Sequence, residues 1–287
     1  MRKVDVIIPT YNRGKVLVDA LPTYWGQSET NSIFIIDDVS TDDTEKIVNE
    51  MKGKSPVPIF YRRLENRANQ QVAKNMGVGM SSAPFIFIGE DDVFLPEKHF
   101  QVLLDVMEKT AADIVAGRRV YLMDGESMEK ALNRASFDKE KIFTRFPFEA
   151  YFERYFEKEK DVPYLHSNAM IKRNVFYEVK YDPSYRGNAF REELDFYLAC
   201  LRKGKKMVAT GQTACFHLKS SRKKGSGSQI KRIKYEYYVW KNTIKCFKKN
   251  SDVFRSKFNM RIPVLYGITG LFARYPYALW KRIKRKF

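Results

Sequence analysis

The stretch Phe85-Ile86-Phe87-Ile88-Gly89-Glu90-Asp91-Asp92-Val93 is an apolar run of strand length that ends in three consecutive carboxylates. Carboxylates at this spacing repel one another unless a cation or a hydrogen-bonding ligand lies among them. At the C-terminal end of a strand in an open α/β sheet, such a cluster lies where ligands bind. An isolated acidic triplet is more often a solvated turn, but its place after a strand predicts a divalent-metal site that holds a phosphorylated substrate.

The rest of the first half alternates strand and helix patterns. Apolar runs predict strands at 4–9, 33–36, 59–64, 85–88 and 114–116, and helical patterns fill 15–24, 40–51 and 71–80, with a further helix opened by Pro96. This alternation predicts an α/β fold, with a mostly parallel sheet flanked by helices.

The second half is less regular. Residues 124–165 are rich in charge and aromatics and are interpreted as an insertion or an acceptor-side lid. Further patterns predict a strand at 168–171, a helix at 190–203, one or two strands at 206–218, a flexible basic loop at 221–228, and a helix from Ile230. Residues 262–280 are apolar and aromatic, but Pro263, Gly267, Gly270 and Pro276 interrupt them. We therefore expect a catalytic domain at 1–220 and a helical extension at 229–287.

Composition limits the classes of partner. The chain has 52 Lys and Arg against 34 Asp and Glu, a net charge of +18, which favours an anionic partner. Its three cysteines form no close-spaced pair, so neither a zinc site nor a disulfide framework is indicated, and a reducing compartment fits. The N-terminus enters a strand with no signal-peptide pattern, and no apolar run is long enough to span a bilayer, so a cytoplasmic location is expected.

Four motifs in order along the chain carry a family resemblance. They are Pro9-Thr10-Tyr11-Asn12, Asp37-Asp38-Val39-Ser40-Thr41-Asp42, Glu90-Asp91-Asp92, and Glu192-Glu193-Leu194-Asp195 with His217 downstream. Together they resemble the inverting glycosyltransferases of family 2, which have the nucleotide-sugar-binding GT-A fold. The resemblance covers Val4 to about Asn242 and implies a GT-A type Rossmann-like sheet. It departs from the family at Glu90 and Glu193, where the family has Asp, and at Lys74, where it has Arg.

The resemblance also implies roles for single residues. The nucleotide-sugar site would comprise Pro9, Tyr11, Asn12, Asp38, Asn66, Lys74 and Asp91, in which Pro9, Tyr11 and Asp38 frame the base. Asp92 is the expected main metal ligand, together with Glu90 and His217. Oxygen ligands suit Mg²⁺ or Mn²⁺, and an imidazole can join them for Mn²⁺. The donor would be a nucleoside diphosphate sugar, by default a uridine one, and the acceptor would be a glycan, a glycolipid or another cell-surface polymer.

Inversion requires a general base that deprotonates the acceptor hydroxyl. Glu193 is the chosen residue. Glu192 and Asp195 remain competitors, because on a helix those two share one face while Glu193 points elsewhere.

The C-terminus allows two interpretations. Trp240, Phe272, Tyr275, Tyr277 and Trp280 lie near a dense Lys/Arg cluster, which suits an interfacial segment on an anionic membrane. On this view the protein is peripheral on the inner face of the cell membrane. The alternative is a pair of core helices with a solvated basic end.

Two other function classes stay open. The charge of +18 would suit a nucleic-acid-binding protein, although acidic clusters at three strand ends would repel phosphate, so no nucleic acid is expected. A nucleotidyltransferase on a related fold would be expected to show a Gly-rich phosphate loop after the first strand. Here that loop, Thr10 to Gly14, has one glycine.

Overall fold

The computed structural model describes all residues except 1, 124, 137–141, 147, 220–231 and 285–287, with side chains of the last helix described as far as Ala273. The predicted basic loop at 221–228 therefore lies outside the described residues, as do the side chains of Tyr275, Tyr277 and Trp280.

A large mixed sheet forms the centre of the molecule. Its strand order in the described residues is β3-β2-β1-β4-β10-β6-β11-β5, with β9 beside β11. The strands are β1 (Val4–Thr10), β2 (Thr30–Asp37), β3 (Ile59–Arg63), β4 (Phe85–Ile88), β5 (Val93–Phe94), β6 (Ile114–Leu122), β9 (Lys160–Asp161), β10 (Met170–Lys172) and β11 (Met207–Leu218). The first four are parallel, β6 and β11 are parallel to each other, and β10 runs antiparallel between β4 and β6. The predicted α/β class is confirmed.

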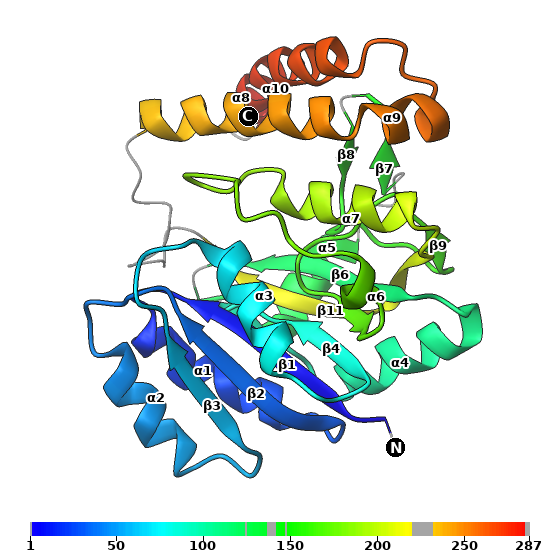
Figure 1. Cartoon of the computed structure of the whole chain (residues 1–287). Helices are drawn as coiled ribbons and strands as arrows, with labels where there is room; N and C mark the ends of the chain where they lie inside the picture. The colour runs from blue at the N-terminus through cyan, green and yellow to red at the C-terminus, as the bar shows by residue number, and fades with distance from the viewer. Residues whose placement is uncertain (1, 124, 137–141, 147, 220–231, 285–287) are drawn as a thin grey trace.

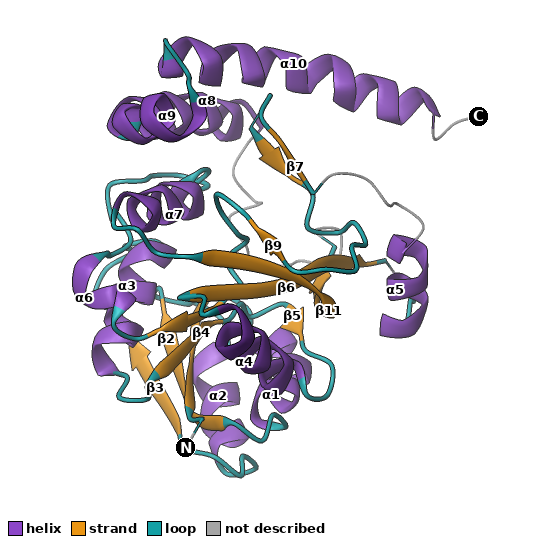
Figure 2. Ribbon diagram, turned by 90° about the vertical axis from the view of Figure 1, so that its right-hand side faces the viewer, coloured by secondary structure: helices purple, strands orange, loops and turns teal. Residues whose placement is uncertain are grey.

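Helices cover both faces of the sheet (Figures 1 and 2). Alternate residues of β1 point to opposite faces, as the period of a strand requires. Val6 and Ile8 pack with α1 (Gly14–Trp25), α2 (Thr44–Lys52) and α4 (His99–Thr110), whereas Ile7 packs with α3 (Gln70–Met80), α6 (Val175–Glu178) and α7 (Glu192–Arg202). The buried strands therefore bring their carboxyl ends together between two apolar layers.

The C-terminal segment forms a further layer beyond α7. It consists of α8 (Arg232–Lys249), α9 (Ser251–Phe258) and α10 (Pro263–Lys284), and Figure 1 shows α8 and α10 side by side at the top of the molecule. The expectation of an interrupted segment at 262–280 is wrong, because α10 is continuous. Pro263 is its first residue, where the missing N–H is tolerated. Gly267 allows close packing, since a Cβ there would lie 2.8 Å from the Phe247 ring.

The C-terminal layer shares the core of the domain. Val253, Phe254, Met260 and Leu271 are buried, and the Phe254 ring stacks on that of Phe247 with their centroids 4.3 Å apart. At least the described part of this segment through Leu271 is thus packed rather than free, as in the core-helix interpretation.

Two further segments differ from the sequence prediction in extent. Strand β6 runs for nine residues rather than the three expected. The segment 124–165 contains α5 (Met128–Ser136) and a hairpin of β7 (Phe143–Thr144) and β8 (Glu149–Ala150). Phe148, Phe156 and Val162 within it are buried, so much of its described part packs on the core.

Candidate active site

A cavity of about 420 Å³ opens at the carboxyl ends of β1 and β4. It is lined by Pro9, Thr10, Tyr11, Arg13, Asp38, Arg67, Asn69, Gln70, Lys74, Gly89, Glu90, Asp91, Asp92, Arg119, Gly187, Asn188, Ala189, Phe190, Glu193, His217 and Tyr235. This is the edge where ligands bind in open α/β sheets. Loop 187–190 passes beneath α8, since a Cβ on Gly187, whose φ is +69°, would collide with the Tyr238 ring.

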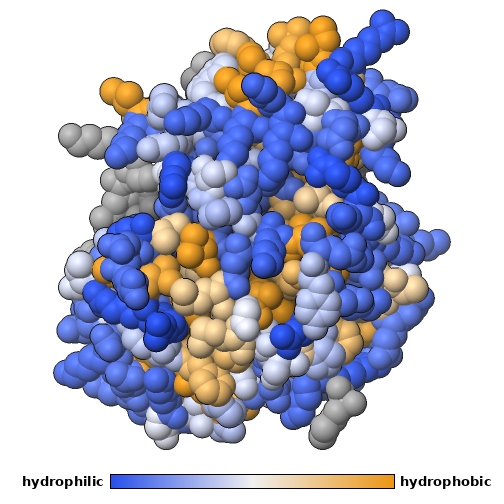
Figure 3. All heavy atoms as spheres, viewed as in Figure 1, coloured by the Kyte–Doolittle hydropathy of each residue, from blue (hydrophilic) through white to orange (hydrophobic). Residues whose placement is uncertain are grey.

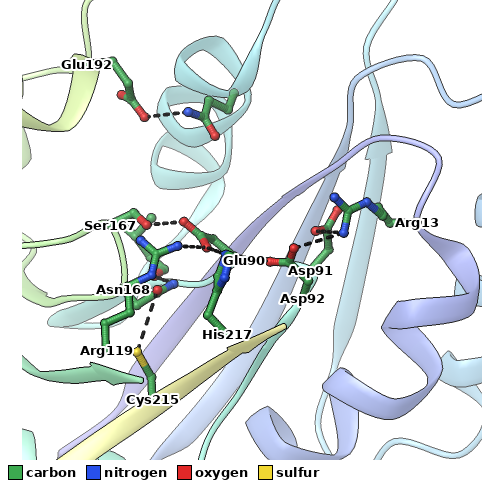
Figure 4. Close-up of polar contacts among 12 residues, drawn as sticks. Arg13, Glu90, Asp91, Asp92, Arg119, Ser167, Asn168, Glu192, Cys215 and His217 are labelled. Atoms are coloured by element: carbon green, nitrogen blue, oxygen red, sulfur yellow. Dashed lines mark hydrogen bonds and ion pairs between the residues drawn. The ribbon is translucent and has the colours of Figure 1, made fainter. Parts of the chain in front are cut away.

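The acidic triplet after β4 does not act as one uniform cluster, because each carboxylate has its own partners (Figure 4). Glu90 contacts Arg119 Nη2 at 3.0 Å and His217 Nε2 at 3.2 Å, and it accepts a hydrogen bond from Ser167. Burial favours its protonated form, but Arg119 and His217 outweigh burial and hold the pKa of Glu90 well below its usual range. Glu90 is therefore a carboxylate at neutral pH.

Asp92 lies between a cation and an imidazole. Its Oδ2 accepts a hydrogen bond from Arg13 Nη1 at 3.0 Å, and its Oδ1 lies 3.3 Å from His217 Nε2. Burial is the largest cause that lowers the pKa of His217, followed by the charge of Arg119, so this imidazole is neutral at neutral pH. A neutral imidazole is the form that binds a metal ion.

Glu90, Asp92 and His217 form a group that could hold a metal ion. One ligand atom from each residue lies within 4.8 Å of the others. Two carboxylate oxygens and one imidazole nitrogen suit Mn²⁺, and the oxygens also suit Mg²⁺. The residues present thus fit a divalent ion of the expected kind.

Asp91 faces away from this group, toward β1. Thr10 Oγ1 donates a hydrogen bond to Asp91 Oδ2 at 2.9 Å, and Arg13 Nη1 lies 3.8 Å from Asp91 Oδ1. Burial, and then the charge of Asp92, raise the pKa of Asp91 to about 7. Its carboxyl remains at the cavity wall, where it can meet a ligand.

The three acidic residues of α7 lie in different surroundings. Glu193 lines the cavity and is partly exposed. Glu192 is buried beside Lys74, whose Nζ lies 2.5 Å from Glu192 Oε1, and burial raises the pKa of Glu192 to about 7. Asp195 is buried against the C-terminal end of α8, where it accepts hydrogen bonds of 2.7 Å from both Lys249 and Asn250. Figure 4 shows Glu192 well apart from the acidic triplet.

The residues expected at the nucleotide site are only partly brought together. Pro9, Tyr11, Asp38, Lys74 and Asp91 line the cavity.

Two others of that set do not line it. Asn12, at a φ of +53°, instead joins the loops after β1 and β2, because its side-chain oxygen accepts the N–H of Thr41 at 2.7 Å and its own N–H donates to Ser40 Oγ at 2.8 Å. Asn66 is exposed and lies outside the cavity lining, to which Arg67, Asn69 and Gln70 contribute instead.

Sequence reasoning missed three arginines in the lining. Arg13 follows the Pro9-to-Asn12 motif directly, and its charge there was a signal that could have been used. Arg119 belongs to an Arg118-Arg119 pair inside an otherwise apolar strand, which is unusual unless those charges have buried partners. Arg67 gave no signal, because its partners Tyr11 and Asp38 are remote in sequence.

Comparisons with known proteins show which family the sequence matches. The family model described as glycosyl transferase family 2 matches residues 5–180. The poly(ribitol-phosphate) β-N-acetylglucosaminyltransferase TarP of Staphylococcus aureus is 30% identical over 135 residues, which is 46% of this chain and 41% of that protein. Glycosyltransferase GlyG of Streptococcus pneumoniae is 30% identical over 116 residues, or 40% of this chain and 38% of that protein. The matched region thus spans about two fifths of the length of these curated relatives.

Solved structures show the same fold at low sequence identity. S. aureus TarS residues 1–349, crystallised in complex with UDP-GlcNAc, superposes with a TM-score of 0.65 and 14% identity, covering 88% of this chain and 67% of that one. The complex of the same TarS fragment with UDP superposes with a TM-score of 0.56 and 12% identity, covering 90% of this chain and 72% of that one.

Proposed function

The chain belongs to glycosyl transferase family 2, and we propose that it is a metal-dependent inverting enzyme that moves a sugar from a nucleoside diphosphate sugar to an acceptor hydroxyl. One observation carries the proposal. The cavity that holds the Glu90, Asp92 and His217 group also holds Glu193, and the other two carboxylates of α7 are buried outside its lining. A site for the leaving diphosphate and a candidate base thus share one space.

The donor would bind along the ends of β1, β2 and β4. Tyr11 and Asp38 would take the base, because an aromatic face and a hydrogen-bond acceptor together recognise a ring that carries an N–H. Uracil is such a ring, and the neighbouring TarS structures contain UDP or UDP-GlcNAc. We therefore place uridine first among the candidate nucleosides.

Glu90, Asp92 and His217 would hold Mn²⁺ or Mg²⁺. When bound, the ion would neutralise charge that develops on the leaving diphosphate. Arg13 fixes one oxygen of Asp92 and leaves the other directed toward His217. Arg119 keeps Glu90 ionised, and burial keeps His217 neutral, so these two residues are in the protonation states that bind a metal ion.

Glu193 would act as the general base. The acceptor hydroxyl oxygen forms a bond to the anomeric carbon while the bond from that carbon to the diphosphate oxygen breaks. The Glu193 carboxylate takes the hydroxyl proton, and the diphosphate leaves with the electron pair of the broken bond. Attack on the face opposite the diphosphate inverts the anomeric centre.

The acceptor would be a glycan, a glycolipid or another polymer of the cell surface. The net charge of +18 favours one that carries phosphate, and the relative TarP is named for a poly(ribitol-phosphate) acceptor.

Attachment to the inner face of an anionic membrane would bring the enzyme to such an acceptor. Among the described helices, none is both long and apolar enough to cross a membrane. Ile262, Leu265 and Phe272 are nevertheless exposed just before and along the first half of α10, and Figure 3 shows hydrophobic residues gathered at the top of the molecule, where α10 lies. Sedimentation with anionic vesicles should show binding that weakens with added salt.

A thermal-shift screen tests the donor proposal most directly. A ligand that binds only the folded state raises the unfolding midpoint. We expect UDP to raise the unfolding midpoint more with Mn²⁺ than without it. In a separate turnover assay, UDP-sugars should release UDP when acceptor is present. Equal midpoints for all nucleoside diphosphates, with and without Mn²⁺, would contradict the proposal.

A further inference from the structure

We propose that Arg67 occupies the place of the donor's nucleobase when no donor is bound, and that every nucleotide donor must displace it. The inference rests on the proposed function, because it takes the surface formed by Tyr11 and Asp38 as the base subsite. It adds a residue that controls how tightly that subsite binds.

Arg67 contacts both recognition elements of the subsite. Its guanidinium carbon lies 3.4 Å from the centroid of the Tyr11 ring, so the planar group covers the aromatic face. Its Nε donates a hydrogen bond to Asp38 Oδ2 at 3.1 Å. These are the two contacts that a base with a ring N–H would make, namely stacking on an aromatic face and donation to an acceptor.

The short distance between the Arg67 guanidinium and the Tyr11 ring leaves no room for a base between them. A distance of 3.4 Å is one stacking distance, so no ring fits between the guanidinium and Tyr11. Both oxygens of Asp38 already accept a hydrogen bond, Oδ2 from Arg67 Nε at 3.1 Å and Oδ1 from the backbone N–H of Ala68 at 2.7 Å, so Asp38 is already engaged when no donor is bound. A base that stacks on this face of Tyr11 must therefore displace the guanidinium of Arg67.

Only the side chain of Arg67 has to move. The backbone on either side is held by the N–H of Leu64, which donates to Asp37 O at 2.8 Å, and by that of Ala68 on Asp38. The Arg67 side chain is 52% exposed, so it can swing into solvent without uncovering the core. The loop that frames the subsite can therefore stay in place while the site opens.

This arrangement has a thermodynamic signature. Displacing Arg67 weakens every ligand that places a base on Tyr11 by the same factor, whichever base it carries. A ligand without a base, such as inorganic pyrophosphate, does not compete with Arg67. Displacement gives up one cation–π contact and one ion pair, and solvent screens both at the half-exposed Arg67 side chain, so removing Arg67 should tighten UDP binding by about 3- to 30-fold.

The test compares the wild type with Arg67→Ala by isothermal titration with UDP, CDP and pyrophosphate, each in the presence of Mn²⁺. We expect Arg67→Ala to bind UDP about 3- to 30-fold more tightly, to keep the ratio of UDP to CDP affinity, and to leave pyrophosphate affinity unchanged. Arg63→Ala is the matched control. Arg63 is also half-exposed and pairs with a carboxylate, Asp37 at 3.6 Å, but neither residue lines the cavity.

The outcomes separate this inference from the proposed function. If the wild type binds UDP and Arg67→Ala binds it equally or more weakly, Arg67 does not compete with the base and the inference alone is wrong. A change in pyrophosphate affinity as large as the change for UDP would show a general effect of charge or structure, and would also overturn it. If no nucleoside diphosphate binds more tightly than pyrophosphate to either protein, both the donor class and the inference are wrong.

Discussion

The three carboxylates of α7 allow a sharp experiment, because their surroundings predict different kinds of damage. We expect Glu193→Gln to lower kcat by about two to four orders of magnitude, the usual range for general-base catalysis, with UDP affinity nearly unchanged. The folded state should not suffer. Glu193 is partly exposed, and no hydrogen bond or ion pair of its carboxylate occurs in the part of the chain that the structure describes. The free energy of unfolding of the Glu193→Gln variant should therefore differ from that of the wild type by less than about 0.5 kcal/mol.

Glu192→Gln and Asp195→Asn should show the opposite pattern. Each carboxylate is buried and accepts a hydrogen bond from a lysine, Glu192 from Lys74 and Asp195 from Lys249. A hydrogen bond to a charged group contributes about 1.5–3 kcal/mol, so each variant should lose stability of that order. For a chain of this size the melting temperature falls by roughly 2–4 °C per kcal/mol. The kcat of the fraction that remains folded should stay within about tenfold of the wild type, since neither carboxylate lines the cavity.

The assay is UDP release from a UDP-sugar in the presence of a cell-envelope acceptor, together with thermal unfolding of the same samples. Glu193 is not the base if Glu193→Gln keeps normal turnover while Glu192→Gln or Asp195→Asn loses it at unchanged stability. The base would then have to be assigned to whichever residue caused the loss.

Three other outcomes are expected. Asp92→Asn should remove activity and most Mn²⁺-dependent UDP affinity. Because Asp92 is buried against Arg13, the substitution should also lower the free energy of unfolding by about 1.5–3 kcal/mol. Normal turnover of the variant with chelator present would contradict the metal role. Truncation after Asn250 should give an aggregating protein, because it removes the buried Phe254. The single substitution Phe254→Ala should lower the free energy of unfolding, measured in urea, by about 3–5 kcal/mol. A soluble truncated protein with a native circular dichroism spectrum would instead favour a free anchor. Burial lowers the pKa of His99 to about 3. Below pH 6.5 the unfolded state therefore takes up a proton that the folded state does not, and the free energy of unfolding decreases as the pH is lowered. The stability difference between wild type and His99→Gln should therefore shrink by about 1.4 kcal/mol per unit from pH 6 to pH 4, and a constant difference would show that His99 is not buried as a neutral ring.

The sequence alone determined those features that depend on neighbours along the chain. The alternation of Val6, Ile7 and Ile8 between two faces follows from the two-residue period of a strand, and strand β4 with the acidic triplet that follows it is encoded within nine residues. The family motifs could be read for the same reason, since each is a local string. Local patterns predicted the lengths of β6 and α10 less well. In α10, packing such as that of Gly267 on Phe247 outweighs the tendency of glycine to break a helix.

Which polar groups meet depends on how the strands and helices are arranged in space. Asp92 and His217 are 125 positions apart, and they meet because β5, just after the triplet, pairs antiparallel with the end of β11. The three carboxylates of α7 have different surroundings because α3, α8 and the cavity lie against different faces of that helix. The spacing of Glu192, Glu193 and Asp195 along the sequence does not specify these neighbours. Arg67 reaches Tyr11 and Asp38 for the same kind of reason, since β1, β2 and β3 are adjacent in the sheet and their carboxyl-end loops lie together. Partners of this sort follow from strand order and register, which depend on the whole chain burying its apolar surface at once.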